Sequence, residues 1–248
     1  MTAPANRPVV VLTGAAGGIG SAAARRFARS GASLALCDVR SSDALEQALA
    51  DAHAAGGAGF FHEADLRDRD QAQALVERAE AEFGRVDVVV TAAGILRWAS
   101  SDDVPWEMWD DVLAVNLTAT WACIRAALPG MLRRGSGRVI TIASDIGQAG
   151  LPDYAAYGAS KGAVISLTKC LAKELAPRGV LVNCVSPGGA ETDMMINSPE
   201  NTPEWLTAVP LGRWGDPDEI AAAIEFLAGP DATYFVGQVV APNGGLVI

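Results

Sequence analysis

The amino-acid sequence predicts an α/β fold, in which one doubly wound parallel β-sheet carries helices on both faces. Short β-branched runs alternate with longer Ala-rich stretches of helical character, an alternation typical of parallel sheets covered by helices. A glycine-rich turn joins the first of these runs to the first helical stretch. The predicted strands cover residues 9–12, 34–37, 86–90, 139–142 and 180–185.

The length and composition favour one compact unit. The chain has 248 residues, of which 50% are apolar, enough to bury a large core. Neither a Pro/Ser-rich linker nor a block of like charges divides it, and α/β folds of this length often form one domain. We therefore expect a single domain over residues 1–248.

A glycine-rich turn at residues 14–20 is the first candidate site. It follows the predicted strand at 8–13 and precedes a predicted helix at 21–30, so backbone N–H groups and the positive end of the helix dipole meet there. A pyrophosphate fits such a place, which predicts a Rossmann-type dinucleotide site. The spacing is GxxxGxG rather than GxGxxG. The candidate contacts are Gly14, Gly18, Ile19 and Gly20.

Asp38 is the residue expected to set the preference between NAD and NADP. It ends the second apolar run, 18 residues after Gly20, where a carboxylate is placed to bind a ribose 2′-hydroxyl. The same carboxylate would repel a 2′-phosphate, although Arg40 could partly offset that repulsion. The sequence thus favours NAD over NADP.

Tyr157, Lys161 and Ser144 form the candidate proton-transfer site. Positions four apart share a helical face, so the Lys161 ammonium can lie beside the Tyr157 phenol. A phenol has a pKa of about 10, and a cation within about 4–6 Å can lower it by about 1–3 pH units. We expect the pair to exchange a proton near neutral pH. Ser144 lies 13 residues before the tyrosine.

Together these motifs resemble the short-chain dehydrogenase/reductase family along nearly the whole chain. The family's TGxxxGIG turn fits residues 13–20, and its PGxxxT turn fits residues 187–192. The resemblance implies that Ser144, Tyr157 and Lys161 are catalytic and that Asn116 completes a water-linked proton relay with the lysine. It also implies that Lys161 holds the nicotinamide ribose. The further cofactor contacts that it implies are Asp65 and Leu66 by the adenine, Ala93 and Gly94 by the adenosine, and Pro187, Gly188 and Thr192 by the nicotinamide.

Two positions depart from the family pattern. Thr91 stands where an asparagine is more common, and a threonine hydroxyl lacks the two donors of an amide. The central strand is therefore expected to be braced differently. Pro242 replaces a residue that is commonly acidic before the final glycines, and because proline cannot donate to a ladder, strand pairing should end near it.

The charge balance excludes one class of partner. The chain has 19 basic and 29 acidic residues, a net charge of −10, and no Lys/Arg-rich run, so we expect no nucleic-acid partner. The same charge disfavours an acidic carrier protein unless a local basic patch compensates. Arg133, Arg134 and Arg178 could supply such a patch, which keeps open an enzyme that reduces 3-oxoacyl groups on a carrier protein.

The cysteines and histidines indicate no metal site. The four cysteines show no CxxC spacing and lie in apolar or helical segments, so we expect buried, reduced thiols at Cys37, Cys123, Cys170 and Cys184. His53 and His62 are isolated and are expected to be structural or surface residues. The first strand follows Arg7 directly and no long uncharged apolar stretch occurs, which predicts a cytoplasmic protein without a membrane partner.

The expected activity is the interconversion of a secondary alcohol and a ketone by NAD-dependent hydride transfer. Tyr157 would act as general acid/base and Ser144 would stabilise the oxyanion. The single domain over residues 1–248 is thus expected to be dinucleotide-binding and catalytic, with a substrate lid at about 188–211. Apolar residues of the lid, among them Met194, Met195 and Trp205, favour a hydrophobic small-molecule alcohol or ketone. The alternatives are a 3-oxoacyl-[acyl-carrier-protein] reductase-like enzyme and a non-catalytic NAD(H)-sensing protein. We expect a homotetramer, with a dimer as the alternative, because the helix at 157–176 and the apolar C-terminus resemble family interfaces.

Overall fold

A single parallel sheet forms the centre of the molecule. The structure, a computed structural model, describes residues 7–248 and orders the strands β3-β2-β1-β4-β5-β6-β7, all parallel. This arrangement confirms the predicted doubly wound α/β fold. The strands are β1 Val9–Thr13, β2 Ser33–Asp38, β3 Gly59–Glu63, β4 Val88–Thr91, β5 Gly137–Ile142, β6 Val180–Val185 and β7 Val239–Val240.

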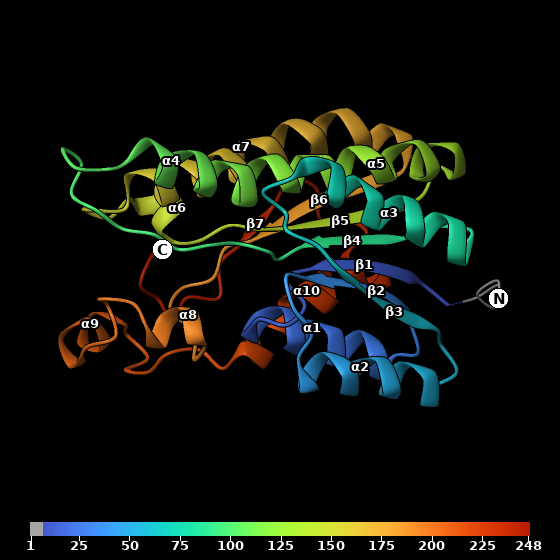
Figure 1. Cartoon of the computed structure of the whole chain (residues 1–248), viewed down its shortest axis with the longest axis horizontal. Coiled ribbons are helices and arrows are strands. Elements are labelled where there is room, and N and C mark those ends of the chain that lie inside the picture. The colour runs from blue at the N-terminus through green and yellow to red at the C-terminus, as the bar shows by residue number, and fades with distance from the viewer. Residues whose placement is uncertain (1–6) are drawn as a thin grey trace.

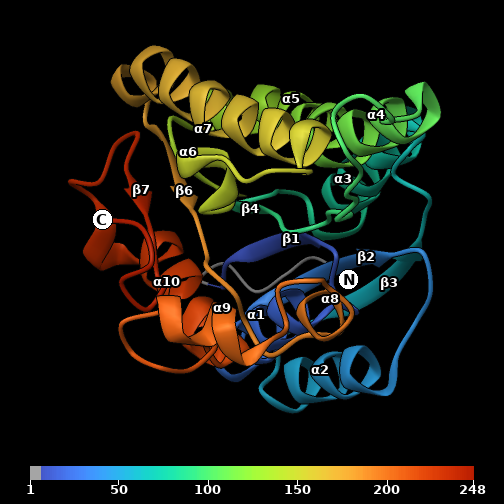
Figure 2. The same ribbon diagram turned by 90° about the vertical axis from the view of Figure 1, so that its left-hand side faces the viewer.

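Helices cover both faces of this sheet. On one side lie α3, α4, α5, α6 and α7, and on the other α1, α2 and α10 (Figures 1 and 2). The α-helices are α1 Gly18–Arg29, α2 Asp43–Ala54, α3 Arg69–Phe83, α4 Trp106–Leu113, α5 Ala119–Arg134, α6 Ile146–Ala149, α7 Ala155–Leu175, α8 Asp193–Ile196, α9 Pro203–Ala208 and α10 Pro217–Ala228. A π-helical turn η1 (Ala114–Thr118) joins α4 to α5, and the 3₁₀ turns are η2 (Ala176–Arg178) and η3 (Pro230–Ala232).

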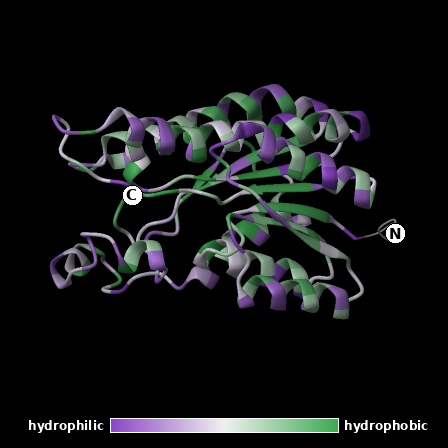
Figure 3. Ribbon diagram, in the orientation of Figure 1, coloured by the Kyte–Doolittle hydropathy of each residue, from purple (hydrophilic) through white to green (hydrophobic). Residues whose placement is uncertain are grey.

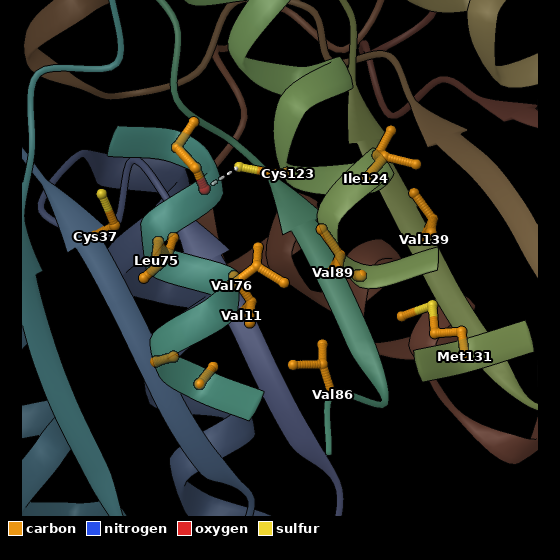
Figure 4. Packing of buried hydrophobic residues seen from close by; sticks show 14 of the residues in the cluster. Val11, Cys37, Leu75, Val76, Val86, Val89, Cys123, Ile124, Met131 and Val139 are labelled. Carbon is orange, nitrogen blue, oxygen red and sulfur yellow. Dashed lines mark hydrogen bonds between the residues drawn. The ribbon is translucent and has the colours of Figure 1, made fainter. Parts of the chain in front are cut away.

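The core consists of two apolar layers, one on each face of the sheet. Because side chains alternate along a strand, Val9 and Val11 of β1 face α3 and α5, whereas Val10 and Leu12 face α1 and α10. The strands are accordingly the most hydrophobic part of the chain (Figure 3). Figure 4 shows the first layer, where the Cys123 thiol donates to the carbonyl of Ala72. Burial on both faces explains the continuous apolar runs of the central strands.

Two edge strands were missed by sequence reasoning. In β3 only Phe60 is fully buried, so the segment shows no β-branched run. The other edge strand, β7, is two residues long and ends before Pro242, as expected. The predicted strand at 86–90 begins at Val88, although Val86 is buried in the core. Edge positions lack the two-sided burial that makes a strand visible in a sequence.

Two departures from expectation concern single side chains. Cys170 on α7 is exposed, so the prediction of a buried thiol is wrong there, whereas the other three cysteines are buried and free. The Thr91 hydroxyl is buried and has no hydrogen-bond partner, so it does not brace the central strands as an amide would. Between residues 7 and 248, no cluster of three potential metal ligands occurs.

One helical stretch, Trp106–Arg134, is long and apolar enough by composition to cross a membrane. It comprises α4, η1 and α5. Its apolar residues include Ile124 and Met131, which are fully buried in the core layer against β4, β5 and α3. Packing against the sheet therefore accounts for its hydrophobic side.

The three arginines considered as a docking patch lie near the amino ends of β5 and β6, opposite the strand ends that carry the candidate site. Arg133 and Arg134 end α5 just before β5 begins, and Arg178 precedes β6. Ser144 follows the other end of β5, whose six residues span about 20 Å at about 3.3 Å per residue. Arg134 also donates to the carbonyl of Val86. The predicted patch does not surround the catalytic residues.

Candidate active site

Two adjoining cavities lie at the carboxyl ends of the strands, where the strand order reverses between β1 and β4. This is where ligands bind in doubly wound sheets. An elongated groove of about 740 Å³ runs over the glycine turn, and a chamber of about 320 Å³ lies beside Tyr157. Their walls share Ile19, Ala92, Gly94, Thr192 and Met194, so the groove leads into the chamber.

The residues predicted to bind the cofactor are brought together by the fold. The groove is lined by Gly14, Gly18, Ile19, Gly20, Asp38, Asp65, Leu66, Ala93, Gly94 and Thr192, and the chamber by Ser144, Tyr157, Lys161, Pro187 and Gly188. Asn116 lines neither cavity and lies behind Gly94.

The glycine turn fits the pyrophosphate of a dinucleotide. Gly17 is the N-cap of α1, so no side chain caps the first turn, and that turn contains no acidic residue. The free N–H groups at the start of α1 are therefore available to an anion. Gly14 has φ +69°, and a Cβ there would lie 2.6 Å from the Ala93 nitrogen, so the turn packs directly against the end of β4. Glycine is required at this position by both the backbone conformation and the close approach.

Asp38 is held rigidly at the tip of β2. One carboxylate oxygen accepts the N–H of Ala16 at 2.9 Å, and the other accepts the N–H of Val39 at 2.8 Å. Each oxygen keeps a lone pair for a ribose hydroxyl. The carboxylate is thus tied to the glycine turn and preorganised to face the groove.

Asp65 and Leu66, the residues predicted to lie by the adenine, both line the groove. The Arg67 guanidinium binds the Asp65 carboxylate at 2.5 Å, and this hydrogen bond holds the pKa of Asp65 below its usual value. The side chain of Leu66 is buried and also lines the groove. This part of the groove therefore combines an apolar floor with an ionised carboxylate.

Tyr157 and Lys161 lie on adjacent turns of α7, as predicted, but their pKa values do not move as expected. Burial raises the pKa of Tyr157 to about 12, although the nearby Ser144 hydroxyl opposes the shift. Burial lowers the pKa of Lys161 to about 8. The ammonium lies 5.7 Å from the phenol ring centre and donates to the carbonyl of Ile142 at 2.9 Å. Lys161 therefore does not lower the pKa of Tyr157 as predicted, because the loss of solvation on burial dominates the shift.

Asn116 occupies the π-helical turn η1, a distortion often found at functional sites. Its side-chain amide donates to Ile95 O and to Ser160 Oγ, and its oxygen accepts the N–H of Ile95 at 2.9 Å. Both the Asn116 oxygen and the Lys161 ammonium lie 3.3 Å from the Cβ position of Gly94. The two side chains therefore approach the same backbone position, with no direct hydrogen bond between them.

Ser144 has a neighbour that sequence reasoning missed. Its hydroxyl donates to Asp145 Oδ1 at 2.9 Å, and both residues are 7% exposed. Burial raises the pKa of Asp145 above its usual value. The available signal was an acid directly after the serine, at the start of a short apolar segment.

A second missed group connects the segment after β6, the predicted lid, to the start of α7. The Tyr154 hydroxyl donates to Glu200 at 2.5 Å, and Ser198 donates to the same carboxylate oxygen at 2.8 Å. The Tyr154 ring packs edge-on against Tyr157, with ring centres 6.4 Å apart. We call this set of three residues, Tyr154, Ser198 and Glu200, the latch. Tyr154 is 44 and 46 residues away from Ser198 and Glu200 in sequence, which leaves no local pattern to find.

The segment after β6 covers both cavities. Thr192 caps α8 by accepting the N–H of Met195, and a Cβ on Gly18 would lie 2.4 Å from its methyl carbon. The segment therefore rests on the glycine turn. Met194, Met195 and Trp205 line the chamber, as the apolar composition of the segment predicted.

Comparisons with known proteins agree with this geometry. A family model described as "Enoyl-(Acyl carrier protein) reductase" matches residues 14–247. A 3-oxoacyl-[acyl-carrier-protein] reductase FabG of Thermotoga maritima is 39% identical over 241 residues, covering 97% of this chain and 98% of the relative. The chain belongs to the short-chain dehydrogenase/reductase family. A 3-oxoacyl-[acyl-carrier-protein] reductase of Synechocystis is also 39% identical, covering 97% of each chain.

Solved structures of short-chain dehydrogenases/reductases share the whole fold. A candidate NAD(P)-dependent gluconate 5-dehydrogenase from Beutenbergia cavernae, crystallised with NADP at low occupancy, superposes with a TM-score of 0.87 at 39% identity, covering 96% of both chains. A short-chain dehydrogenase/reductase mutant from Serratia marcescens gives 0.89 at 32% identity, covering 96% of this chain and 97% of that one. As a member of this family, the protein is an oxidoreductase that binds a nicotinamide cofactor, which sets aside the non-catalytic sensor.

Proposed function

We propose that the protein is a reductase of 3-oxoacyl thioesters. The observation that carries the proposal is that relatives named 3-oxoacyl-[acyl-carrier-protein] reductase are 38–39% identical over 95–97% of this chain. The apolar chamber beside Tyr157 supports it, because an acyl chain needs such a wall. This substrate class was the alternative at the level of sequence, and the relatives favour it over an unspecified alcohol.

The chain's own residues supply the proton and hold the reacting oxygen. The 3-oxo oxygen lies between the hydroxyls of Tyr157 and Ser144, and Tyr157 donates its proton as negative charge develops there. The raised pKa of Tyr157 keeps the phenol protonated at neutral pH, as reduction requires. Lys161 and Asn116 return a proton to the phenolate through water. When bound, the reduced nicotinamide cofactor supplies the hydride that the 3-oxo carbon accepts.

The nature of the thioester carrier is the next part of the proposal. A carrier protein is acidic, the net charge of this chain is −10, and the three arginines lie about a strand length from the chamber. Recognition through the acyl chain and the thioester arm therefore dominates over docking of the carrier's surface. We expect coenzyme A thioesters to be reduced as well as carrier-bound ones.

The test compares acetoacetyl-carrier protein, acetoacetyl-coenzyme A and a cyclic ketone of similar size, following loss of NADH and NADPH absorbance. We expect kcat/KM for both thioesters to exceed that for the ketone by about tenfold or more, since about 1.4 kcal/mol of added transition-state binding gives a factor of ten. Equal or better use of the ketone would contradict the thioester assignment. It would favour the second candidate, NAD-dependent oxidation of hydrophobic secondary alcohols, which the apolar wall of Met194, Met195 and Trp205 also fits.

We further propose that NAD(H) is preferred over NADP(H), because Asp38 is anchored facing the groove and its charge would repel a 2′-phosphate. Asp38→Ser should narrow the ratio of kcat/KM between NADH and NADPH by about tenfold or more, the equivalent of about 1.4 kcal/mol. Arg40 also lines the groove, so Arg40→Ala in the Asp38→Ser background should weaken NADPH alone. An unchanged ratio in Asp38→Ser would show that another group sets the preference.

A further inference from the structure

Asp145 lies where it competes for the proton of the catalytic serine. It forms part of the chamber wall, between the end of β5 and the start of α6. Its Oδ1 accepts the Ser144 hydroxyl at 2.9 Å and the N–H of Ile146 at 2.7 Å, while the same N–H lies 3.2 Å from Ser144 Oγ. Ser144, Asp145 and Ile146 thus form one closed hydrogen-bonded group.

A serine hydroxyl carries a single proton. When Asp145 is ionised, it can only accept, and a hydrogen bond to a carboxylate is stronger than one to a neutral ketone. The Ser144 proton is then directed at Asp145, and a ketone oxygen in the chamber has Tyr157 as its donor. When Asp145 is protonated, its own O–H can donate to Ser144 Oγ, which frees the serine proton for the ketone.

We propose that Asp145 is a positioning residue that controls the Ser144 proton, holding it away from a ketone as a carboxylate and releasing it as a neutral acid. The inference rests on the proposed reductase function, since it concerns how a ketone oxygen is polarised. It identifies a residue that acts through Ser144 rather than on the substrate.

The surroundings of Asp145 allow both protonation states. The ionisable side chains that line the chamber with it, among residues 7–248, are Tyr157 and Lys161 of α7 and Glu200 of the lid. From the end of β6 it meets a backbone group, the carbonyl of Pro187, which accepts the N–H of Asp145 at 3.0 Å. Within residues 7–248, the Asp145 carboxylate forms no ion pair. Burial without a cationic partner raises its pKa, so the neutral form becomes populated at a higher pH than for an exposed aspartate.

This control has a defined pH signature. The productive form for reduction has neutral Asp145, so kcat/KM for the ketone should fall as pH rises through the pKa of Asp145 in the cofactor-bound enzyme. Burial raises the pKa of Tyr157 to about 12 and lowers that of Lys161 to about 8. Both residues remain in the Asp145→Asn and Ser144→Ala variants, so loss of the fall in these variants identifies Asp145 as its source.

The experiment measures kcat/KM for reduction between pH 4.5 and 9 in the wild type, Asp145→Asn, Ser144→Ala and the double variant. Asp145→Asn removes the charge and the titration: its amide oxygen can still accept the N–H of Ile146, and as a neutral acceptor it holds the Ser144 proton less strongly than a carboxylate does. We expect the fall in kcat/KM with rising pH to be absent from Asp145→Asn, and kcat/KM of this variant at pH 7.5 to be several-fold higher than that of the wild type. We expect the fall to be absent from Ser144→Ala as well, and Asp145→Asn to change nothing further in that background.

Glu200→Gln is the matched control, because it removes another negative charge from the chamber wall and should still show the fall in kcat/KM with rising pH. The same fall as in the wild type, seen in Asp145→Asn or in Ser144→Ala, would overturn the proposal. Ser144→Ala leaves Asp145 in place, so the test holds even if Asp145→Asn does not fold. Any reducible ketone or thioester serves as substrate, so failure of the thioester assignment would appear separately, as a different substrate preference.

Discussion

At the scale of single residues, burial rather than pairing of Tyr157 with Lys161 sets the pKa values of these two side chains. Tyr157 and Lys161 lie on the same side of α7, as the spacing indicated, and both are nearly inaccessible. Desolvation disfavours the charged form of each, so the pKa of the phenol rises to about 12 while that of the ammonium falls to about 8. The phenol is a proton donor at neutral pH, which suits reduction. Oxidation of an alcohol, which needs the phenolate, should therefore accelerate as pH rises.

Tyr157→Phe tests the role of the phenol most directly. The substitution removes the proton donor and leaves the ring, so kcat should fall by about 10²–10⁴-fold, the usual contribution of general acid catalysis. Binding of NADH, followed by its fluorescence, should change little. A variant that keeps a substantial rate would contradict the assignment of Tyr157 as the acid.

At the scale of elements, the glycine turn and the segment carrying α8 are packed against each other. A Cβ on Gly18 would lie 2.4 Å from the Thr192 methyl carbon and 3.0 Å from its Cβ, whereas one on Gly17 would meet only the Gly14 carbonyl at 3.4 Å. Thr192 cannot simply rotate away, because its hydroxyl caps α8. The close approach therefore fixes the position of the segment carrying α8 against the groove.

Gly18→Ala should therefore displace α8 and weaken NADH binding by about tenfold, a loss of about 1.4 kcal/mol. Gly17→Ala is the control and should bind NADH almost as the wild type does. Titration of both variants by NADH fluorescence measures the difference. Equal affinities would show that the contact between Gly18 and Thr192 does not hold the groove in shape.

The latch should keep the lid closed over the chamber. Tyr154→Phe removes the hydrogen bond to Glu200, and a bond to a charged group contributes about 1.5–3 kcal/mol. We expect faster amide hydrogen exchange in residues 193–208 and a several-fold higher KM for the substrate. Tyr234→Phe, at a fully exposed tyrosine, is the control. Unchanged exchange in Tyr154→Phe would mean that other contacts hold the lid.

At the scale of the whole molecule, apolar side chains remain exposed on the last quarter of the chain. Phe226, Tyr234 and Ile248 are exposed, and Trp121 on α5 is partly so. Contiguous apolar patches, rather than single exposed side chains, mark surfaces that bind other chains. The homotetramer therefore stays a prediction. Light scattering at micromolar concentration should give about four times the chain mass of 25.6 kDa, and a monomer would contradict the expectation.

The sequence by itself determined the fold class, and it predicted site residues that the fold brings to two adjoining cavities. The alternation of apolar runs and helical stretches predicted the parallel sheet, because central strands are buried on both faces. The glycine turn, Asp38 and the residues Ser144, Tyr157 and Lys161 were found because their chemistry depends on short, fixed spacings. Local geometry carries such motifs into the fold unchanged.

The tertiary structure alone decided the environments of these residues. It placed the Asp145 carboxylate where it accepts the Ser144 hydroxyl and the Glu200 carboxylate where it accepts the Tyr154 hydroxyl. It also raised the pKa of Tyr157 through burial. It also placed Arg134 near the amino end of β5, away from the candidate site. Burial and contacts between distant segments arise only when the chain is packed, because desolvation depends on all neighbours of a group rather than on those adjacent in sequence.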